Sequence, residues 1–358
     1  MSRPPTRPLG NGGPEVTRIG FGLMGLSSYY GNTLPVEEGL CVLDRAYELG
    51  ERFWDTGKLA TGKNRSMKLT GPRAADVYSG NEELVCEWFA RNPEKRQEIF
   101  LATKFSLRTL PDGTTSRNSS PEYALRACDA SLSRLGTSYI DLYYCHRLDG
   151  KTPVEETVGA MIQLKSAGKI KYLGLSECSA ASLRRAHAIH PISAVQMEYS
   201  PFSLEVESPE YNMLETCRDL GVALVAYSPL GRGMMSGALR SVEDFEDGDF
   251  RRTLPRFSAE NFPKNLQLVD RICKLATRRN VHPSQLTLAW LLAQGGDIFP
   301  IPGTTKIDRL KENVDSMFLG LSEDTVAQFR KAVEEANVHG DRSSETLSQM
   351  LFVDTPLQ

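Results

Sequence analysis

Short apolar runs alternate with longer amphipathic segments along most of this chain. Eight of the runs, each four to six residues long, have the length and composition of strands. These predicted strands are Arg18–Gly22, Glu51–Asp55, Ile99–Lys104, Ile140–Cys145, Ile170–Leu175, Ala194–Met197, Val222–Tyr227 and Ile298–Ile301. Strands that alternate with helical segments pair in parallel, so the pattern predicts an α/β protein.

The segments between the strands have the period of amphipathic helices. In Pro153–Lys165 the apolar residues, Val154 and Met161 among them, share one face, and Gly168 follows as a typical helix end. Pro283–Ala293 begins with proline, which suits the first turn of a helix. Eight strand–helix units over about 300 residues favour a closed (β/α)8 barrel over an open, doubly wound sheet.

One barrel domain can account for the length of 358 residues. We expect the barrel at about residues 15–337, with an atypical insertion at 57–74 and a C-terminal tail at 338–358. The segment Gly231–Asn265, after the seventh strand, is long, polar and rich in glycine and proline, which predicts a functional loop. The tail is expected to be either a loop beside the substrate or a frayed terminus.

Composition excludes several classes of protein. The net charge is −3 without a long run of one sign, so nothing indicates a nucleic-acid or membrane partner. Seven cysteines without a Cys-x-x-Cys pair predict reduced thiols and not a disulfide framework or zinc site. Because the chain has no apolar N-terminal segment and no run of membrane-spanning length, we expect a cytoplasmic protein.

Four polar residues stand at or after the ends of three successive predicted strands. Asp55 ends the second strand and Tyr78 follows it, Lys104 ends the third, and His146 comes directly after the fourth. Each residue alone has an ordinary structural explanation, such as a helix cap or a solvated rim position. Because strand ends meet on one face of a barrel, the four together predict a catalytic site.

These residue types suit the reduction of a carbonyl group by hydride, which needs a proton donor at the developing alkoxide. A tyrosine with its ordinary pKa of about 10 is too weak an acid, but a neighbouring lysine ammonium lowers that pKa. Asp55 can hold Lys104, and His146 can orient the carbonyl, while a nicotinamide cofactor supplies the hydride. His146 has no companions at metal-ligand spacing, so no metal site is predicted.

The residues around this site resemble the aldo-keto reductase superfamily, and the resemblance extends over nearly the whole chain. Without residues 57–74, the sequence reads Phe-Trp-Asp-Thr-Ala-Asp-Val-Tyr, which resembles the catalytic segment of that family. The resemblance implies a TIM barrel that reduces aldehydes or ketones with NADPH and releases NADP+. It implies Tyr78 as the general acid/base, Lys104 and Asp55 as the pair that tunes its pKa, and His146 as the carbonyl-orienting residue.

The same resemblance implies a cofactor site along the later strand ends. Its residues would be Ser176, Glu177, Gln196, Tyr227, Ser228, Pro229, Leu230, Gly231, Gly303, Thr304, Thr305, Lys306, Arg309, Glu312 and Asn313. Lys306 and Arg309 could bind a ribose 2′-phosphate, which favours NADPH over NADH. Glu177 departs from the family's usual asparagine, since a carboxylate accepts hydrogen bonds but cannot donate one.

Three further sequence motifs place the resemblance within the microbial and fungal branch of YakC-type, pyridoxal-reductase-like enzymes. They are Ser-Glu-Cys-Ser-Ala from Ser176, Arg-Ala-His-Ala-Ile-His-Pro from Arg185 and Phe-Arg-Arg-x-x-Pro-Arg-Phe from Phe250. Glutamate at position 177 looks usual for that branch. Neither the physiological carbonyl substrate, nor the direction of the reaction, nor the choice between monomer and homo-oligomer follows from the sequence.

The segment Gly57–Ala74 interrupts the catalytic loop. Tyr78 follows Asp55 by twenty-three positions, where the family pattern has five, and the extra residues include five cations and no acid. One hypothesis is a retained intron of eighteen codons, because its ends and Leu69-Thr70 can be encoded by splice-site and branch-point sequences. The alternative is a lineage-specific loop at the substrate mouth.

Two other functions stay open beside the reductase. Potassium-channel β subunits share this barrel, so a nucleotide-binding regulatory subunit is one alternative, although fold alone decides no function. The other is a catalytically weak barrel that binds the cofactor without oxidising it.

Overall fold

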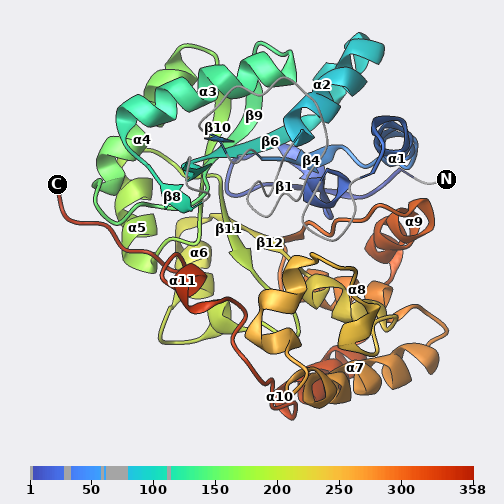
Figure 1. The fold of residues 1–358 in the computed structure, drawn as a ribbon. Helices are drawn as coiled ribbons and strands as arrows, with labels where there is room; N and C mark the ends of the chain where they lie inside the picture. Colours follow the sequence, from blue (N-terminus) through green and yellow to red (C-terminus); the bar gives the residue numbers. More distant parts are fainter. Residues whose placement is uncertain (1–2, 28–33, 58–59, 62–79, 111–113) are drawn as a thin grey trace.

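The computed structural model describes residues 3–27, 34–57, 60–61, 80–110 and 114–358 (Figure 1). Eight parallel strands at its centre form one curved sheet. In sheet order they are β3 (Phe21–Gly22), β4 (Phe53–Asp55), β6 (Phe100–Phe105), β9 (Ile140–Cys145), β10 (Ile170–Ser176), β11 (Ala194–Glu198), β12 (Ala223–Tyr227) and β13 (Ile298–Pro300). All eight predicted strands are present, although β3 and β4 are clearly shorter than the predicted Arg18–Gly22 and Glu51–Asp55.

Backbone hydrogen bonds join the two edges of this sheet. The Gly20 N–H donates to the Pro300 carbonyl at 2.9 Å, and the Gly22 N–H donates to that of Pro302 at 3.2 Å. A Cβ atom at position 22 would lie 2.7 Å from the Ile301 carbonyl oxygen, so this approach of the two edges requires glycine. The sheet therefore closes into the predicted (β/α)8 barrel.

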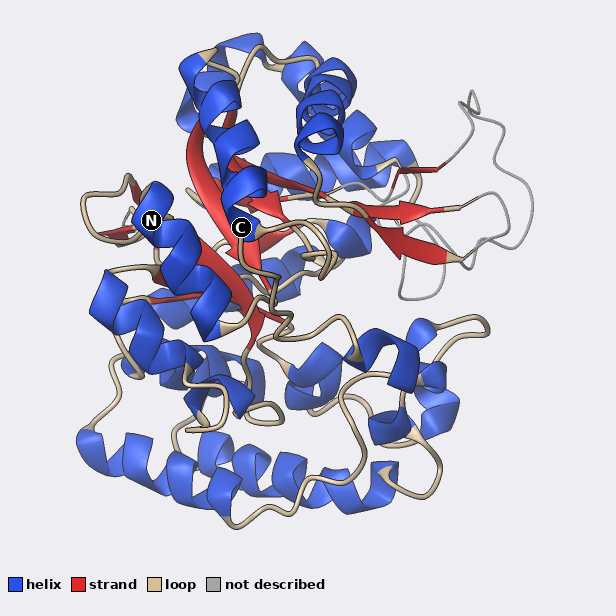
Figure 2. Cartoon of the chain, turned by 90° about the vertical axis from the view of Figure 1, so that its left-hand side faces the viewer, coloured by secondary structure: helices blue, strands red, loops and turns tan. Residues whose placement is uncertain are grey.

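Helices cover the outside of the sheet (Figures 1 and 2). They are α1 (Val36–Glu48), α2 (Asn81–Arg91), α3 (Pro121–Leu135), α4 (Val154–Ser166), α5 (Ala180–Ile189), α6 (Met213–Leu220), α7 (Phe262–Thr277), α8 (Pro283–Ala293), α9 (Ile307–Asp315) and α10 (Glu323–Glu334). The prediction for α8 has the observed bounds, and that for α4 differs by one residue at each end. Gly168, with φ +71°, follows α4 as predicted.

Alternate residues of each strand build two separate cores. In β12, Leu224 and Ala226 pack outward against the helices, whereas Ala223 and Val225 face the barrel interior. The interior is filled by side chains and is closed at one end by the hairpin of β1 (Thr6–Pro8) and β2 (Glu15–Thr17), where Val16 is buried. The barrel is thus a packed scaffold for groups at the strand ends.

The segment after β12 is more ordered than the predicted loop. It contains four short 3-10 helices, which are η4 (Gly231–Ser236), η5 (Val242–Asp244), η6 (Phe250–Thr253) and η7 (Pro255–Phe257). Met234, Phe245 and Phe257 are buried, so apolar contacts hold this polar segment against the barrel. Its last residues already belong to α7.

The C-terminal tail is packed against the barrel and is not frayed. It carries α11 (Glu345–Ser348) and runs across the front of the molecule in Figure 1. The Val353 N–H donates to the Glu177 carbonyl, and the Ser179 N–H donates to that of Val353, both at 2.9 Å. Thr355 is buried beyond them.

A second small sheet stands beside the barrel. It joins β5 (Ala60–Thr61), β7 (Leu107–Thr109) and β8 (Thr115–Arg117), with β5 parallel to β7. Of the expected insertion, Gly57 and the two residues of β5 are described, so the remainder of that prediction lies outside the described residues. No helix in the described part of the chain is long and apolar enough to cross a membrane.

Candidate active site

A buried ion pair lies where β4 and β6 end. The Lys104 ammonium donates to one oxygen of Asp55 and, at 2.8 Å, to the Thr56 carbonyl. Gln196, from β11, donates to the other Asp55 oxygen at 2.8 Å. The side chains of Lys104 and Asp55 are 0% and 3% exposed, so water does not screen their attraction.

The charges of this pair depend on each other. Burial raises the pKa of Asp55 above its ordinary value, and the positive charge and hydrogen bonds of Lys104 and Gln196 counteract that effect. A buried carboxylate of this kind stays ionised only beside a buried cation. Asp55 and Lys104 therefore fix one ammonium group in a defined position, as the sequence predicted.

His146 lies next to this pair, at the end of β9. Its backbone N–H donates to the Phe105 carbonyl at 2.8 Å, which connects it to the neighbouring strand. Burial, with the cations Arg147 and Lys104 close by, holds the pKa of His146 well below 6.5. The imidazole is therefore neutral near pH 7, and it can donate one hydrogen bond without carrying charge. Tyr78, the fourth predicted residue, lies outside the described residues.

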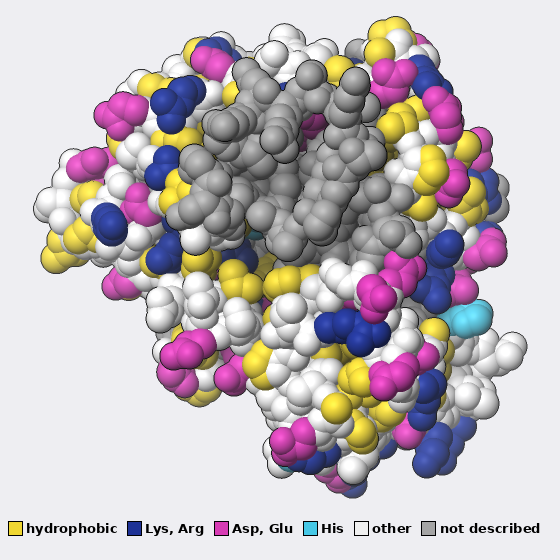
Figure 3. All heavy atoms as spheres, in the orientation of Figure 1, with side chains coloured by type: hydrophobic (Ala, Val, Ile, Leu, Met, Phe, Trp, Pro, Cys, Tyr) yellow, Lys and Arg dark blue, Asp and Glu magenta, His cyan; other side chains and the backbone are white. Residues whose placement is uncertain are grey.

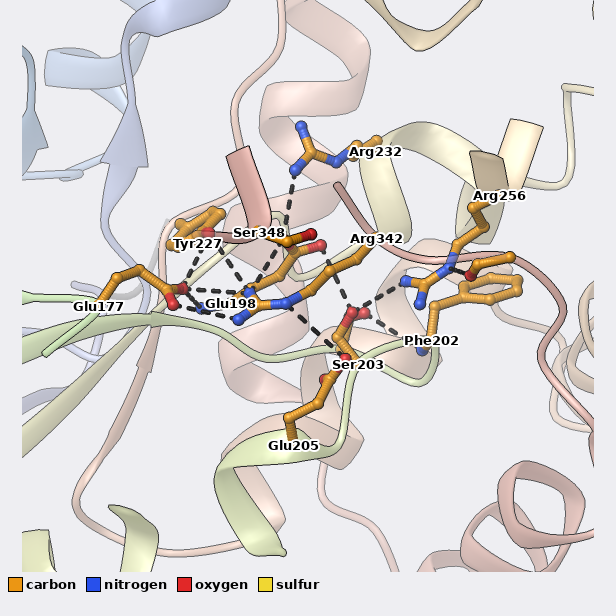
Figure 4. Close-up of polar contacts among 12 residues, drawn as sticks. Glu177, Glu198, Phe202, Ser203, Glu205, Tyr227, Arg232, Arg256, Arg342 and Ser348 are labelled. Atoms are coloured by element: carbon orange, nitrogen blue, oxygen red, sulfur yellow. Dashed lines mark hydrogen bonds and ion pairs between the residues drawn. The ribbon is translucent and has the colours of Figure 1, made fainter. Parts of the chain in front are cut away.

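The predicted nicotinamide end of the site is a cluster of polar side chains (Figure 4). The Tyr227 hydroxyl donates to Glu177 Oε1 at 2.9 Å, and the Glu198 N–H donates to the same oxygen at 3.1 Å. Ser176 accepts from the Arg147 guanidinium at 2.9 Å. Gln196, which was also predicted at this end of the site, directs its amide to Asp55.

The chain makes a tight turn directly after β12. Ser228 and Gly231 have φ values of +50° and +55°, and the Gly231 N–H donates to the Ser228 carbonyl at 2.9 Å. A Cβ atom at position 231 would lie 2.6 Å from the ring of Phe202, so glycine is required there. Pro229 and Leu230 complete this turn.

The predicted adenosine end lies between β13 and α9. Gly303 approaches the first strand so closely that a Cβ atom would lie 2.6 Å from the Gly22 carbonyl oxygen. Lys306 and Arg309 are exposed at the beginning of α9, and neither forms an ion pair within the described ranges. Two cations at a helix N-terminus suit a phosphate group.

The other predicted residues of this end have varied surroundings. Thr304 accepts from the Lys306 N–H at 3.1 Å, and Thr305 is partly buried. Glu312 accepts from the Ser284 hydroxyl at 3.4 Å, and Asn313 is buried. Among the residues that the structure describes, no three His, Cys, Asp or Glu side chains gather in a way that could hold a metal ion.

A model of the aldo/keto reductase family matches residues 18–334. The chain belongs to the aldo/keto reductase family. It is 47% identical over 355 residues to the aldo-keto reductase yakc [NADP(+)] of Schizosaccharomyces pombe, covering 98% of each chain. It is also 47% identical over 357 residues to the aldo-keto reductase str7 of Strobilurus tenacellus, again covering 98% of each.

Solved structures agree with the fold of this aldo/keto reductase. The glycerol dehydrogenase of Gluconobacter oxydans superposes with a TM-score of 0.76 at 23% identity, over 92% of this chain and 94% of that one. The thermostable aldo-keto reductase Tm1743, solved with the inhibitor epalrestat, gives a TM-score of 0.68 at 25% identity, over 92% and 99%. The family membership makes this protein an oxidoreductase.

Two arginines of this aldo/keto reductase were not predicted as site residues. Arg147 directly follows His146, and its guanidinium lies 6.0 Å from the centre of the Tyr227 ring. Its position directly after a strand end could have indicated a site residue. Arg342 belongs to the tail and contacts Glu177, which is far away in the sequence. No periodic pattern marks it.

Proposed function

We propose that this protein reduces an aldehyde or ketone to an alcohol with NADPH. The buried Asp55–Lys104 pair beside the neutral His146 is the observation that carries the proposal. The relative from Schizosaccharomyces pombe has NADP(+) in its name, which supports the choice of cofactor. When bound, the cofactor supplies a hydride to the carbonyl carbon.

The chain's own residues handle the proton. Tyr78 is proposed to donate its phenolic proton to the carbonyl oxygen as negative charge develops there. The Lys104 ammonium stabilises the resulting phenolate, because its position is fixed by Asp55 and the Thr56 carbonyl. His146, being neutral, donates a hydrogen bond to the same carbonyl oxygen and orients it.

The cofactor residues divide the site into two ends. We propose that Ser176, Glu177 and Tyr227 hold the nicotinamide, and that the turn Ser228–Gly231 lies along the pyrophosphate. At the other end, Lys306 and Arg309 would bind the 2′-phosphate, with the remaining predicted residues around the adenosine. Exposed cations without partners in the described ranges fit an anionic group, whereas NADH offers none at this position.

The insertion Gly57–Ala74 is proposed to weaken catalysis without preventing folding. Extra loop length costs little free energy, because the entropy of loop closure grows slowly with length. Proton transfer is more demanding, and an error of about 1 Å in placing a reacting group can cost about a hundredfold in rate. This expectation holds whether the segment is a retained intron or a lineage-specific loop.

The test is NADPH oxidation with 4-nitrobenzaldehyde, measured on the full chain and on a form without residues 57–74. Higher activity of the shortened form supports both the reductase function and an inhibitory insertion. Equal activity supports the reductase function and assigns the segment to the working enzyme. If both forms bind NADPH and neither oxidises it with a panel of aldehydes and ketones, the reductase proposal fails and a cofactor-binding module is favoured.

A further inference from the structure

A cluster of opposite charges, most of them buried, lies at the ends of β10, β11 and β12 (Figure 4). Its carboxylates are Glu177, Glu198 and Glu205, and its guanidinium groups are Arg232, Arg256 and Arg342. The strand ends supply two of the acids, the segment after β12 supplies two of the arginines, and the tail supplies Arg342. The cluster thus joins three parts of the chain that are far apart in sequence.

Arg342 is at the centre of this cluster. Its side chain is 5% exposed, and its two terminal nitrogens donate to the two oxygens of Glu177, each at 3.1 Å. One of these nitrogens also donates to Glu198 at 3.3 Å. A bidentate contact with a planar carboxylate fixes orientation as well as charge, which a lysine ammonium does not do.

Glu177 needs this partner. Its side chain is fully buried, and burial alone would raise its pKa, but the guanidinium groups of Arg342 and Arg147 hold that pKa below the ordinary value. The residue also has φ +48°, an unfavourable backbone conformation for a side chain other than glycine or asparagine. The tail supports that conformation too, because the Val353 N–H donates to the Glu177 carbonyl.

The two oxygens of Glu177 are used unequally. Oε1 accepts from Tyr227, from the Glu198 N–H and from Arg342, whereas Oε2 accepts from Arg342 alone within the described part of the chain. A carboxylate oxygen has two lone pairs, which Oε1 shares among three donors and Oε2 uses for one. Oε2 therefore keeps the capacity to accept from an amide NH2 group, such as a carboxamide.

We propose that Arg342 is a positioning residue, which from the C-terminal tail holds Glu177 and Tyr227 in place for the nicotinamide carboxamide. This inference rests on the proposed function, because it assigns the cluster to one end of the NADPH site. Arg342 acts through the Glu177 carboxylate. The same carboxylate holds Tyr227, whose hydroxyl donates a hydrogen bond to it. The tail is then part of the cofactor site and more than a wall of the substrate pocket.

The test compares two ligands that share one end of the site. NADPH contacts both ends, whereas adenosine 2′,5′-bisphosphate contacts the adenosine end alone. Dissociation constants are measured on the full-length protein, by fluorescence for NADPH and by calorimetry for the bisphosphate. Arg342→Met is expected to weaken NADPH binding by about tenfold or more, since it leaves a buried carboxylate unpaired, and to leave bisphosphate binding unchanged.

A matched control separates positioning from attachment of the tail. Arg185, on α5, donates to the carbonyls of Thr355 at 2.8 Å and Pro356 at 2.6 Å and pairs with Glu155 at 2.7 Å. Arg185→Met therefore removes another attachment of the tail without touching Glu177. It is expected to leave both dissociation constants unchanged.

Two more variants connect the effect to the carboxylate. Arg342→Lys is expected to restore little NADPH affinity, because one ammonium cannot serve both oxygens. The double variant Arg342→Met with Glu177→Gln is expected to bind NADPH better than Arg342→Met alone, because no buried charge remains unpaired. If Arg342→Met does not fold, Arg342→Lys and the double variant carry the comparison.

The outcomes distinguish this inference from the proposed function. If the unaltered protein binds no NADPH, the proposed function fails. If it binds NADPH but the Arg342 variants bind it equally well, or lose both ligands to the same extent, Arg342 has no positioning role. A loss of NADPH affinity in Arg185→Met equal to that of Arg342→Met would overturn the inference in favour of simple attachment of the tail.

Discussion

Replacing Lys104 by methionine tests the electrostatics of the candidate site directly. Both members of the Asp55–Lys104 pair are almost completely buried, so the substitution leaves a carboxylate without its cation. Breaking a buried pair in this way typically costs about 3–5 kcal/mol of folding free energy. We expect a loss of this size for Lys104→Met at pH 8, measured by urea unfolding followed by the fluorescence of the three buried tryptophans.

The loss should depend on pH. Burial already raises the pKa of Asp55 above 3.8, and without Lys104 it rises further. A group with a raised pKa in the folded state binds more protons in that state, so stability increases as pH falls towards the unfolded pKa. Lys104→Met is therefore expected to lose less stability at pH 5 than at pH 8.

The control is the double variant Lys104→Met with Asp55→Asn. It has no buried charge at this position, so most of the lost unfolding free energy should return. What loss remains should be the same at pH 5 and pH 8. The reasoning is refuted if Lys104→Met loses the same free energy at pH 5 and pH 8. It is also refuted if the double variant is as unstable as the single one.

Two other charged regions give further predictions. Burial raises the pKa of Glu51 to about 8 although its carboxylate accepts from the Thr17 hydroxyl at 2.8 Å and the Phe53 N–H at 2.7 Å. Because that pKa is raised in the folded state, stability should decline as pH rises through about 8, and Glu51→Gln should flatten the decline in urea unfolding between about pH 7 and pH 9. Lys306→Ala and Arg309→Ala should each weaken NADPH binding by about tenfold, the loss of one charged hydrogen bond, and leave NADH binding unchanged. Equal effects on the two cofactors in titration calorimetry would contradict the assignment of these cations to the 2′-phosphate.

The sheet was predictable because its strands bury both faces. In β9 all six residues are buried, and such a run has few other interpretations within an alternating chain. The Asp55–Lys104 pair followed from the same reasoning, since parallel strands bring their ends together. Gln196 was likewise predicted at the end of its strand, but its hydrogen bond to Asp55 was not predicted, because the sequence does not show which neighbouring strand end a side chain faces.

The tail was harder to predict for a physical reason. Arg342 and Glu177 are separated by 165 positions, and an ion pair leaves no periodic pattern in either segment. The four 3-10 helices after β12 were missed similarly, because short turns depend on local capping and buried aromatic contacts more than on hydrophobic period. Contacts between polar residues that are distant in the sequence are therefore visible in the structure but cannot be predicted from the sequence pattern.

The surface adds little to the assignment of partners. On the face shown in Figure 3, described Lys and Arg side chains are interspersed with Asp and Glu, and neither sign dominates. A nucleic-acid surface would need cations gathered along one stripe or groove. The electrostatic features that bear on function are instead the buried pairs at the strand ends, where low dielectric strengthens each interaction.

The position of the insertion explains how a barrel can tolerate it. The chain enters it after Thr56, whose hydroxyl donates to the side chain of Asn81 at the beginning of α2, and both residues are fully buried. Asn81 also donates to the Leu23 carbonyl at 2.8 Å. Thr56, just before the insertion, and Asn81, seven positions after it, are thus joined within the barrel, and the entropy of closing the loop between them grows only slowly with its length.

Either side of the insertion, Asp55 or Asn81, could determine where Tyr78 lies. In the sequence Tyr78 precedes the anchored Asn81 by only three positions, whatever the length of the segment before it. If contacts on the Asn81 side place the phenol, the insertion is harmless. If the short connection from Asp55 places it, eighteen extra residues remove that constraint, and the shortened form should be the more active. The comparison of the two forms therefore measures which anchor positions the proposed acid.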